Sequence, residues 1–284
     1  MKIAVFTVGT PDLTVETLPG QLKHYGYNGV EWRVAERPAA APQPLPDRSQ
    51  WYWTYNQATL NLAAIEAEAQ HAKELCDGVG LEIVCLSTYL TPDKLDEIER
   101  VMRAAQAIHC PKMRVMAPGY RGDTSYVQLF DATQRYLADA AALAEKHKIK
   151  LILEIHHRNI IPSASAAYRL VSPFPAESVG VIYDPGNMVH EGFEQYRLGV
   201  ELLGEYLDHV HIKDARPQYS PEQGRWTIEW CSVGDGMVDF PELVRALRSA
   251  GYTGWLSIED FSNERDTAGK LAHNIKYLLE LLNA

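Results

Sequence analysis

Short apolar runs and amphipathic stretches alternate along the chain. Eight of the runs are rich in branched and aromatic residues and have the length of a buried strand. They cover about 2–8, 29–34, 81–89, 112–117, 150–157, 179–184, 208–214 and 254–260. Between them lie stretches with helical spacing, such as the face that carries Leu243, Ala246, Leu247 and Ala250. This alternation predicts a parallel sheet with helices packed against it.

Eight strand–helix units in 284 residues favour a closed ring of strands over an open sheet. We therefore predict a single (β/α)8 TIM barrel that spans residues 1–284. An open, doubly wound sheet is the alternative. It is weakened because no Gly-x-Gly-x-x-Gly motif follows the first strand.

Two connections are longer than the others. One, at about 35–57, is rich in proline and alanine and contains Trp51, Tyr52 and Trp53, and the other, at about 215–238, follows the seventh strand. Long connections within a compact domain usually belong to lids or binding loops. We expect both to cover the mouth of the active site, with a subunit contact or a plain surface excursion as alternatives for the first.

Polar side chains occur where the predicted strands end. The carboxyl ends of all strands in such a barrel meet on one side, so these side chains are the candidates for chemistry. They are Glu31, Arg33, Arg114, Glu154, His156, Asp184, Asn187, His209, His211, Lys213 and Glu259. Alternation along a strand places Glu154 and His156 on one face. In the seventh strand it likewise places His209, His211 and Lys213 on one face.

Two glutamates, one aspartate and one or two histidines converge from four neighbouring strands in this arrangement. Three carboxylates so close together would repel, and one or two would take up protons unless a cation neutralised them. Oxygen donors with one imidazole suit Mn²⁺, Mg²⁺, Co²⁺ or Zn²⁺. Any one of these residues alone is better explained as an ion-pair partner or a core histidine. The whole set at matching strand ends predicts one divalent metal ion.

The net charge limits the kinds of partner to expect, and the cysteine spacing indicates the cellular compartment. With 27 basic and 37 acidic residues the net charge is −10, which argues against nucleic acid and suits a small-molecule substrate. The four cysteines are scattered without a Cys-x-x-Cys pair, which is typical of reduced thiols in a cytosolic protein. No signal peptide precedes the first strand, and no apolar run approaches the ~20 residues of a membrane span. We expect a cytoplasmic protein with no membrane partner, and a homo-oligomer stays open.

Four motifs at the strand ends resemble a known superfamily. They are Leu153-Glu154-Ile155-His156, Tyr183-Asp184-Pro185-Gly186-Asn187, His211-Ile212-Lys213-Asp214 and Ser257-Ile258-Glu259-Asp260. They are similar to the xylose-isomerase-like sugar phosphate isomerase/epimerase superfamily, and the similarity extends over essentially the whole chain. The resemblance implies a TIM barrel that acts as a metal-dependent isomerase or epimerase.

The resemblance also implies roles for individual residues. The metal ligands would be Glu154, Asp184, His211 and Glu259. The two glutamates would double as acid and base, and His156 matches a substrate-contacting histidine. Asn187 stands where the superfamily's epimerases carry a histidine, and Arg216 stands one residue from their substrate-binding arginine.

Four further residues complete the predicted substrate-binding set: Glu31, Arg33, Arg114 and Lys213. The three basic residues would bind a carboxylate or phosphate, or simply neutralise the acidic mouth, and the sequence does not separate these roles. His157 is expected to point away from the site, because it lies on the strand face opposite His156.

These residues predict proton transfer next to a carbonyl group, through an enediolate, on a sugar, sugar phosphate or related keto-polyol. A metal on the carbonyl oxygen stabilises the developing charge, and a carboxylate beside the carbon acts as base. Glu154 and Glu259 come from different strands, so one can remove a proton and the other return it on the opposite face.

Two alternative activities stay open. One is a keto-inositol dehydratase, which would use the same metal site and the same first step. The other, less favoured, is a metal-dependent hydrolase like the related DNA-repair endonucleases. For that activity Glu31, His109 and His209 are the only evident extra ligands, and the acidic charge is wrong for DNA.

Overall fold

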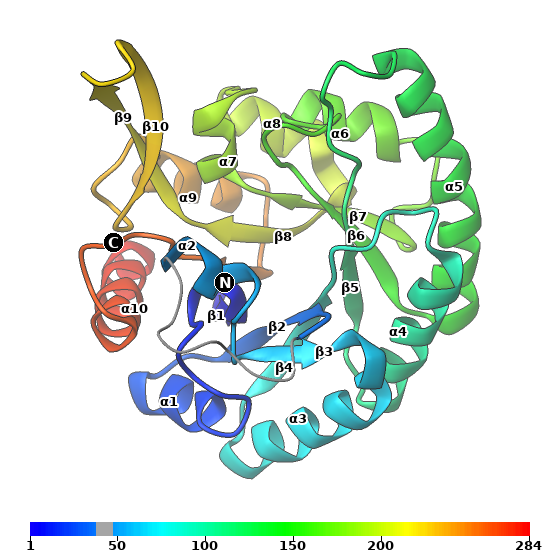
Figure 1. Ribbon diagram of the computed structural model, residues 1–284, viewed down its shortest axis with the longest axis horizontal. Coiled ribbons are helices and arrows are strands. Elements are labelled where there is room, and N and C mark those ends of the chain that lie inside the picture. Colours follow the sequence, from blue (N-terminus) through cyan, green and yellow to red (C-terminus); the bar gives the residue numbers. More distant parts are fainter. Residues whose placement is uncertain (38–47) are drawn as a thin grey trace.

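The computed structural model describes residues 1–37 and 48–284. Eight parallel strands form a ring: β1 (Lys2–Phe6), β2 (Gly29–Ala35), β4 (Glu82–Ser87), β5 (Lys112–Val115), β6 (Lys150–Glu154), β7 (Val179–Tyr183), β8 (Leu207–Ile212) and β11 (Trp255–Ile258). The ring closes because β1 pairs with both β2 and β11 (Figure 1). The predicted (β/α)8 barrel is therefore confirmed, and the open sheet is excluded.

Helices surround the ring (Figure 1). Their apolar side chains pack with those of the strands in the hydrophobic core. They are α1 (Leu18–Tyr25), α3 (Ile65–Val79), α4 (Leu95–Ala107), α5 (Tyr126–His147), α6 (Ala164–Val171), α8 (Tyr196–Leu203), α9 (Phe240–Ser249) and α10 (Thr267–Asn283). In α9 the buried residues Leu243, Ala246 and Leu247 repeat with helical spacing. None of the helices in the described ranges combines the length and the apolar character that crossing a membrane requires.

Two stretches that follow barrel strands contain regular structure beyond the eight strand–helix units. After β7 the chain turns at once into α7 (Pro185–His190), because Asp184 Oδ1 accepts a hydrogen bond from the Asn187 backbone N–H at 2.9 Å. Pro185 suits the first helical position, where its missing N–H costs nothing. After β8 the strands β9 (Asp214–Ser220) and β10 (Arg225–Cys231) form an antiparallel hairpin that extends away from the ring (Figure 1).

Part of the connection predicted at about 35–57, residues 38–47, lies outside the described residues. The chain continues through α2 (Arg48–Trp53) into β3 (Thr59–Asn61), which pairs with β2. The buried amide of Asn56 fixes this path, since its Nδ2 donates to the carbonyl oxygens of Thr7 and Val8 at 3.2 and 3.1 Å. This path brings Trp53 to the carboxyl end of the barrel.

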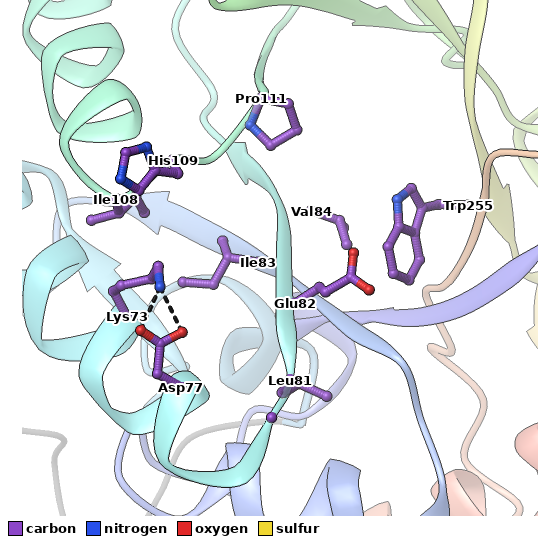
Figure 2. Close-up of a pocket in the computed structure, with 11 residues that line it drawn as sticks. Lys73, Asp77, Leu81, Glu82, Ile83, Val84, Ile108, His109, Pro111 and Trp255 are labelled. Atoms are coloured by element: carbon purple, nitrogen blue, oxygen red, sulfur yellow. Dashed lines mark hydrogen bonds and ion pairs between the residues drawn. The ribbon is translucent and has the colours of Figure 1, made fainter.

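The barrel is plugged at its amino-terminal end. The Trp255 indole packs there against Val84, and a Cβ at Gly29 would lie 2.7 Å from Val84 Cγ1 and 2.9 Å from the indole. A cavity of about 690 Å³ lies beside this plug, between α3 and β4 (Figure 2). Its Lys73 is already paired with Asp77, with Nζ 2.6 Å from Oδ1. This end of the barrel therefore serves stability, and the convergent chemistry lies at the opposite end.

Candidate metal and proton-transfer site

Four side chains from adjacent strands meet at the carboxyl end of the barrel. Glu154 ends β6, Asp184 follows β7, His211 lies in β8 and Glu259 follows β11. The Nδ1 atom of His211 lies 3.3 Å from Glu154 Oε1, 3.4 Å from Asp184 Oδ2 and 3.8 Å from Glu259 Oε2. All four side chains are buried. We call these four residues the carboxylate cage.

The carboxylate cage has the donor types and the spacing of a divalent metal site. One ligand atom from each residue lies within 4.8 Å of all the others. Two ligands about 2.1 Å from one cation are themselves about 3 to 4.2 Å apart, so this spacing fits. Three carboxylates and one imidazole, without a thiolate, suit Mg²⁺, Mn²⁺, Co²⁺ or Zn²⁺. The structure thus brings together the four residues that the sequence predicted as metal ligands.

The two glutamates of the carboxylate cage differ in their electrostatics. Burial alone would raise the pKa of Glu154, but Arg114, His211 and Lys213 outweigh burial and hold that pKa well below its usual range. Burial raises the pKa of Glu259 to about 7, and the Glu154 carboxylate adds to the shift while Lys213 opposes it. Glu154 therefore stays ionised, whereas Glu259 can gain or lose a proton near neutral pH.

Lys213 places a buried ammonium group on the same oxygens. Its Nζ donates a hydrogen bond to Glu259 Oε2, forms an ion pair with Asp184 Oδ2 at 2.9 Å, and lies 3.6 Å from Glu154 Oε1. Gly186 in α7 permits this position, because a Cβ there would lie 2.5 Å from Lys213 Cγ and 2.6 Å from its carbonyl oxygen. Lys213 is therefore the cage's own countercharge, in direct contact with its three carboxylates.

Glu31 lies on the far side of the His211 ring from the carboxylate cage and is fully buried. Its carboxylate accepts hydrogen bonds from Ser257 Oγ at 2.6 Å and Ser87 Oγ at 2.5 Å. It also lies 2.9 Å from His209 Nε2 and 3.2 Å from His211 Nε2. A proton on His211 Nε2 leaves the Nδ1 lone pair free for a metal, which is the usual arrangement around metal-bound histidines. Because Ser87, Ser257, His209 and His211 occupy the Glu31 oxygens, we infer a positioning role for Glu31, and its predicted substrate contact stays a prediction.

The hydrolase alternative loses support in this geometry. Within residues 1–37 and 48–284, the second group of potential metal ligands consists of Glu31, His209 and His211, and it shares His211 with the carboxylate cage. The Glu31 oxygens are already occupied by hydrogen bonds. His109 lines the cavity at the amino-terminal end of the barrel, far from this group in the fold.

Replacing Glu31 by glutamine is expected to lower the affinity for a divalent metal by about 10- to 100-fold, because a neutral amide holds the His211 Nε2–H less strongly than the carboxylate and makes the imidazole a weaker ligand. Calorimetric titration of the metal-free protein with Mn²⁺ measures this affinity. Glu82→Gln is the matched control, since that exposed carboxylate lies at the other end of the barrel. Equal affinities in the two variants would contradict the positioning role.

Asn187 and Arg114 hold the carboxylate cage in place. The Asn187 side-chain amide donates to Glu154 Oε1 at 3.0 Å and Asp184 Oδ2 at 2.9 Å, so it ties two predicted metal ligands together. Arg114 donates from Nη1 to the other oxygen of Glu154 at 2.5 Å. Its guanidinium also stacks over Tyr89, with 4.7 Å from Cζ to the ring centroid. Both residues therefore contact the cage directly. The Nη2 atom of Arg114 is a buried donor without a partner in the described part of the chain, so the predicted substrate contact of Arg114 stays open.

Arg33 lies farther from the cage than the sequence suggested. Its Nη1 donates to Thr59 Oγ1 at 2.6 Å and its Nη2 donates to the Trp53 carbonyl oxygen at 2.7 Å. The guanidinium also lies over the Tyr89 ring, at 5.2 Å from the centroid. These contacts show that Arg33 anchors the segment that carries Trp53.

The expected orientation of His157 is wrong. Its Nδ1 lies 3.0 Å from Asn187 Oδ1, and its ring stacks on His156 and on His190 at 4.4 and 4.3 Å between centroids. Strand β6 ends at Glu154, and Arg158 takes a left-handed backbone with a φ of 61°. Side chains alternate between two faces only while the chain stays extended, so the alternation seen in β6 does not predict the orientation of His156 and His157.

A continuous arc of rings borders the carboxylate cage. Successive centroids lie 4.3 to 6.1 Å apart along the order His156, His157, His190, Trp230, Phe261, Trp53 and Tyr89. We call these seven residues the aromatic wall. The Lys213 ammonium group lies over two of its rings, 5.2 Å from Trp230 and 5.6 Å from Phe261. The cluster of aromatic residues around Trp53 was the one sign of this wall in the sequence, because its members come from six separate segments.

Arg216 does not reach the carboxylate cage. It lies in β9, where its Nε donates to Glu229 Oε1 on β10 at 2.9 Å, and its Nη2 lies 3.5 Å from Glu264 Oε1. Together with Trp230 and Phe261 these residues line a separate cavity outside the cage. Arg216 could therefore contact only a part of the substrate that extends beyond the carboxylate cage into this cavity.

Comparison with known proteins agrees with this geometry. The family model described as xylose isomerase-like TIM barrel matches residues 19–281. Inosose dehydratase of Geobacillus kaustophilus (strain HTA426) is 27% identical over 167 residues, which is 55% of this chain and 50% of that protein. The chain thus spans about half the length of the curated relatives it matches first.

Solved structures show the same fold at low sequence identity. The apo 3-keto-D-glucoside 4-epimerase from E. coli has a TM-score of 0.72 and 16% identity, and each chain is covered in full. The IOLI protein with a bound zinc atom has a TM-score of 0.72 and 15% identity, covering 100% of this chain and 98% of that one.

Proposed function

The chain belongs to the xylose isomerase-like TIM barrel family, and on that premise we propose that it is a divalent-metal-dependent isomerase or epimerase that moves protons next to the carbonyl group of a sugar or related keto-polyol. The observation that carries this proposal is the convergence of three buried carboxylates on the His211 imidazole at the carboxyl end of the barrel, and the two glutamates of this cage have opposite pKa shifts in the metal-free protein. Such divergence in neighbouring carboxyl groups is typical of acid–base catalysis. The metal would be held by Glu154, Asp184, His211 and Glu259.

Each residue has a distinct part in the proposed reaction. A bound divalent cation would polarise the substrate carbonyl and stabilise charge on its oxygen. Glu259 would remove the proton, because its carboxylate lies in the cage beside the predicted metal site. Glu154, held ionised by Arg114, offers a second carboxylate from another strand that can act on the opposite face of the carbon. The aromatic wall limits the access of water.

A keto-polyol dehydratase is the second candidate. The curated relative from Geobacillus is named an inosose dehydratase, which favours this outcome for a related substrate. The first step would be the same proton removal, followed by loss of a neighbouring hydroxyl group. The buried Lys213 ammonium group, which is ion-paired with Glu259, would stabilise the negative charge on the leaving oxygen.

The proposal is tested by NMR in D₂O. Protein loaded with Mg²⁺ or Zn²⁺ is incubated with ketoses, keto acids and inososes, and the C–H signal next to the carbonyl is followed. Exchange with rearrangement supports the isomerase or epimerase, and exchange with loss of water supports the dehydratase. Protein stripped of metal serves as the control. Absence of exchange across the panel, also with Mn²⁺ and Co²⁺, contradicts the proposed function.

A further inference from the structure

A second concave site lies just outside the carboxylate cage. It is a cavity of about 460 Å³ lined by Arg216, Glu229, Trp230, Phe261, Asn263 and Glu264. This volume is within the usual range for small-molecule sites. The β9–β10 hairpin, which is additional to the eight strand–helix units, supplies Arg216, Glu229 and Trp230. The segment after β11 supplies the other three residues.

The cavity adjoins the carboxylate cage through shared aromatic side chains. Trp230 and Phe261 line the cavity, and their ring centroids lie 5.7 Å apart. The same two rings contact the Lys213 ammonium group, which in turn is ion-paired with Asp184 and Glu259. Trp230 and Phe261 are therefore the shared boundary between the carboxylate cage and the cavity.

The polar side chains of the cavity are planar and already oriented. Arg216 pairs with Glu229 at 2.9 Å and approaches Glu264 at 3.5 Å, which restricts all three side chains. Each is about two-fifths exposed, so donors and acceptors are left over for a ligand. One guanidinium against two carboxylates makes the lining acidic, which disfavours a phosphate or carboxylate group. Aromatic faces combined with planar hydrogen-bonding groups suit a neutral polyhydroxy ring, which has apolar C–H faces and hydroxyl edges.

We propose that this cavity is an outer sugar subsite and that the substrate is a glycoside. Its keto-polyol unit lies at the carboxylate cage, and a second, uncharged sugar ring stacks on Trp230 and bonds to Arg216 and Glu229. The inner half of this inference depends on the proposed function, whereas the outer half depends on the cavity alone. The hairpin is then the element that determines substrate length.

The test compares ketoses with and without a second ring. Calorimetry on the Mg²⁺-loaded protein measures the dissociation constants of D-fructose and of three glucosyl-fructoses, turanose, maltulose and isomaltulose. At least one disaccharide is expected to bind tenfold or more tightly than fructose. In Trp230→Ala and in Glu229→Gln the ratio of the two dissociation constants is expected to fall at least fivefold.

Trp226→Ala is the matched control, because Trp226 lies on the same hairpin, is 69% exposed and does not line the cavity. Its ratio is expected to equal that of the wild type. A gain below tenfold for all three disaccharides, or a ratio kept in both cavity variants, overturns the subsite. Deuterium exchange into fructose is measured in parallel, and it decides the proposed function independently of the disaccharide result.

Discussion

Replacing Glu259 by glutamine is expected to lower the rate of deuterium incorporation into substrate by about 10²- to 10⁴-fold, while the barrel stays folded. Glutamine has the same shape but cannot accept the substrate proton at its amide. Glu154→Gln is expected to have a similar effect, because Glu154 is the second carboxylate of the cage and lies against Arg114. The rate is measured by NMR in D₂O with saturating metal.

Both glutamates are also proposed metal ligands, so loss of metal must be separated from loss of the acid–base group. The bound metal is therefore counted in each variant by elemental analysis, and rates are compared per metal-loaded site. Glu205→Gln is the control and is expected to keep the wild-type rate. Glu205 is an exposed carboxylate in the turn Gly204–Tyr206, which precedes the amino-terminal end of β8. Wild-type exchange in both cage variants would refute the acid–base assignment.

Replacing Lys213 by methionine is expected to raise the affinity for a divalent metal by about 10- to 100-fold. The ammonium group contacts the three oxygens that face His211 Nδ1, so a metal must displace it. Breaking one or two charge-assisted hydrogen bonds costs about 1.5–3 kcal/mol, and each 1.4 kcal/mol is a factor of ten. Methionine keeps the apolar stem against Trp230 but removes the competing charge. The measurement is calorimetric titration with Mn²⁺.

The same variant has a second signature in the absence of metal. Without the ammonium group three buried carboxylates lose a countercharge, so metal-free Lys213→Met protein is expected to melt at a lower temperature than the wild type. Added metal is expected to restore its melting temperature. Lys112→Met, which removes another largely buried ion pair, with Asp208, is expected to lower stability without changing metal affinity. Unchanged or weaker metal binding in Lys213→Met would show that the ammonium group does not compete.

The amino-acid order was enough to predict the barrel and the membership of the carboxylate cage. Apolar runs separated by amphipathic stretches report directly on burial, and burial patterns are local in the chain. Parallel strands in a ring end on one side, so Glu154, Asp184, His211 and Glu259 follow from their positions at the ends of their strands. Neither the prediction of the barrel nor that of the cage residues requires knowing how the loops are folded.

The surroundings of the cage depended on the folded chain. Glu31 and His211 are 180 residues apart in sequence, and their contact exists because the ring closes between β1 and β2. The position of His157 and the aromatic wall depends on where strands stop and loops turn, which alternation does not report. The β9–β10 hairpin is stabilised by cross-strand pairs such as Arg216 with Glu229. Its two strands are polar and one contains Pro217, so they lack the apolar run that identifies a buried strand in a sequence. Local pattern fixes which side chains are buried, whereas distant contacts fix what each buried side chain touches.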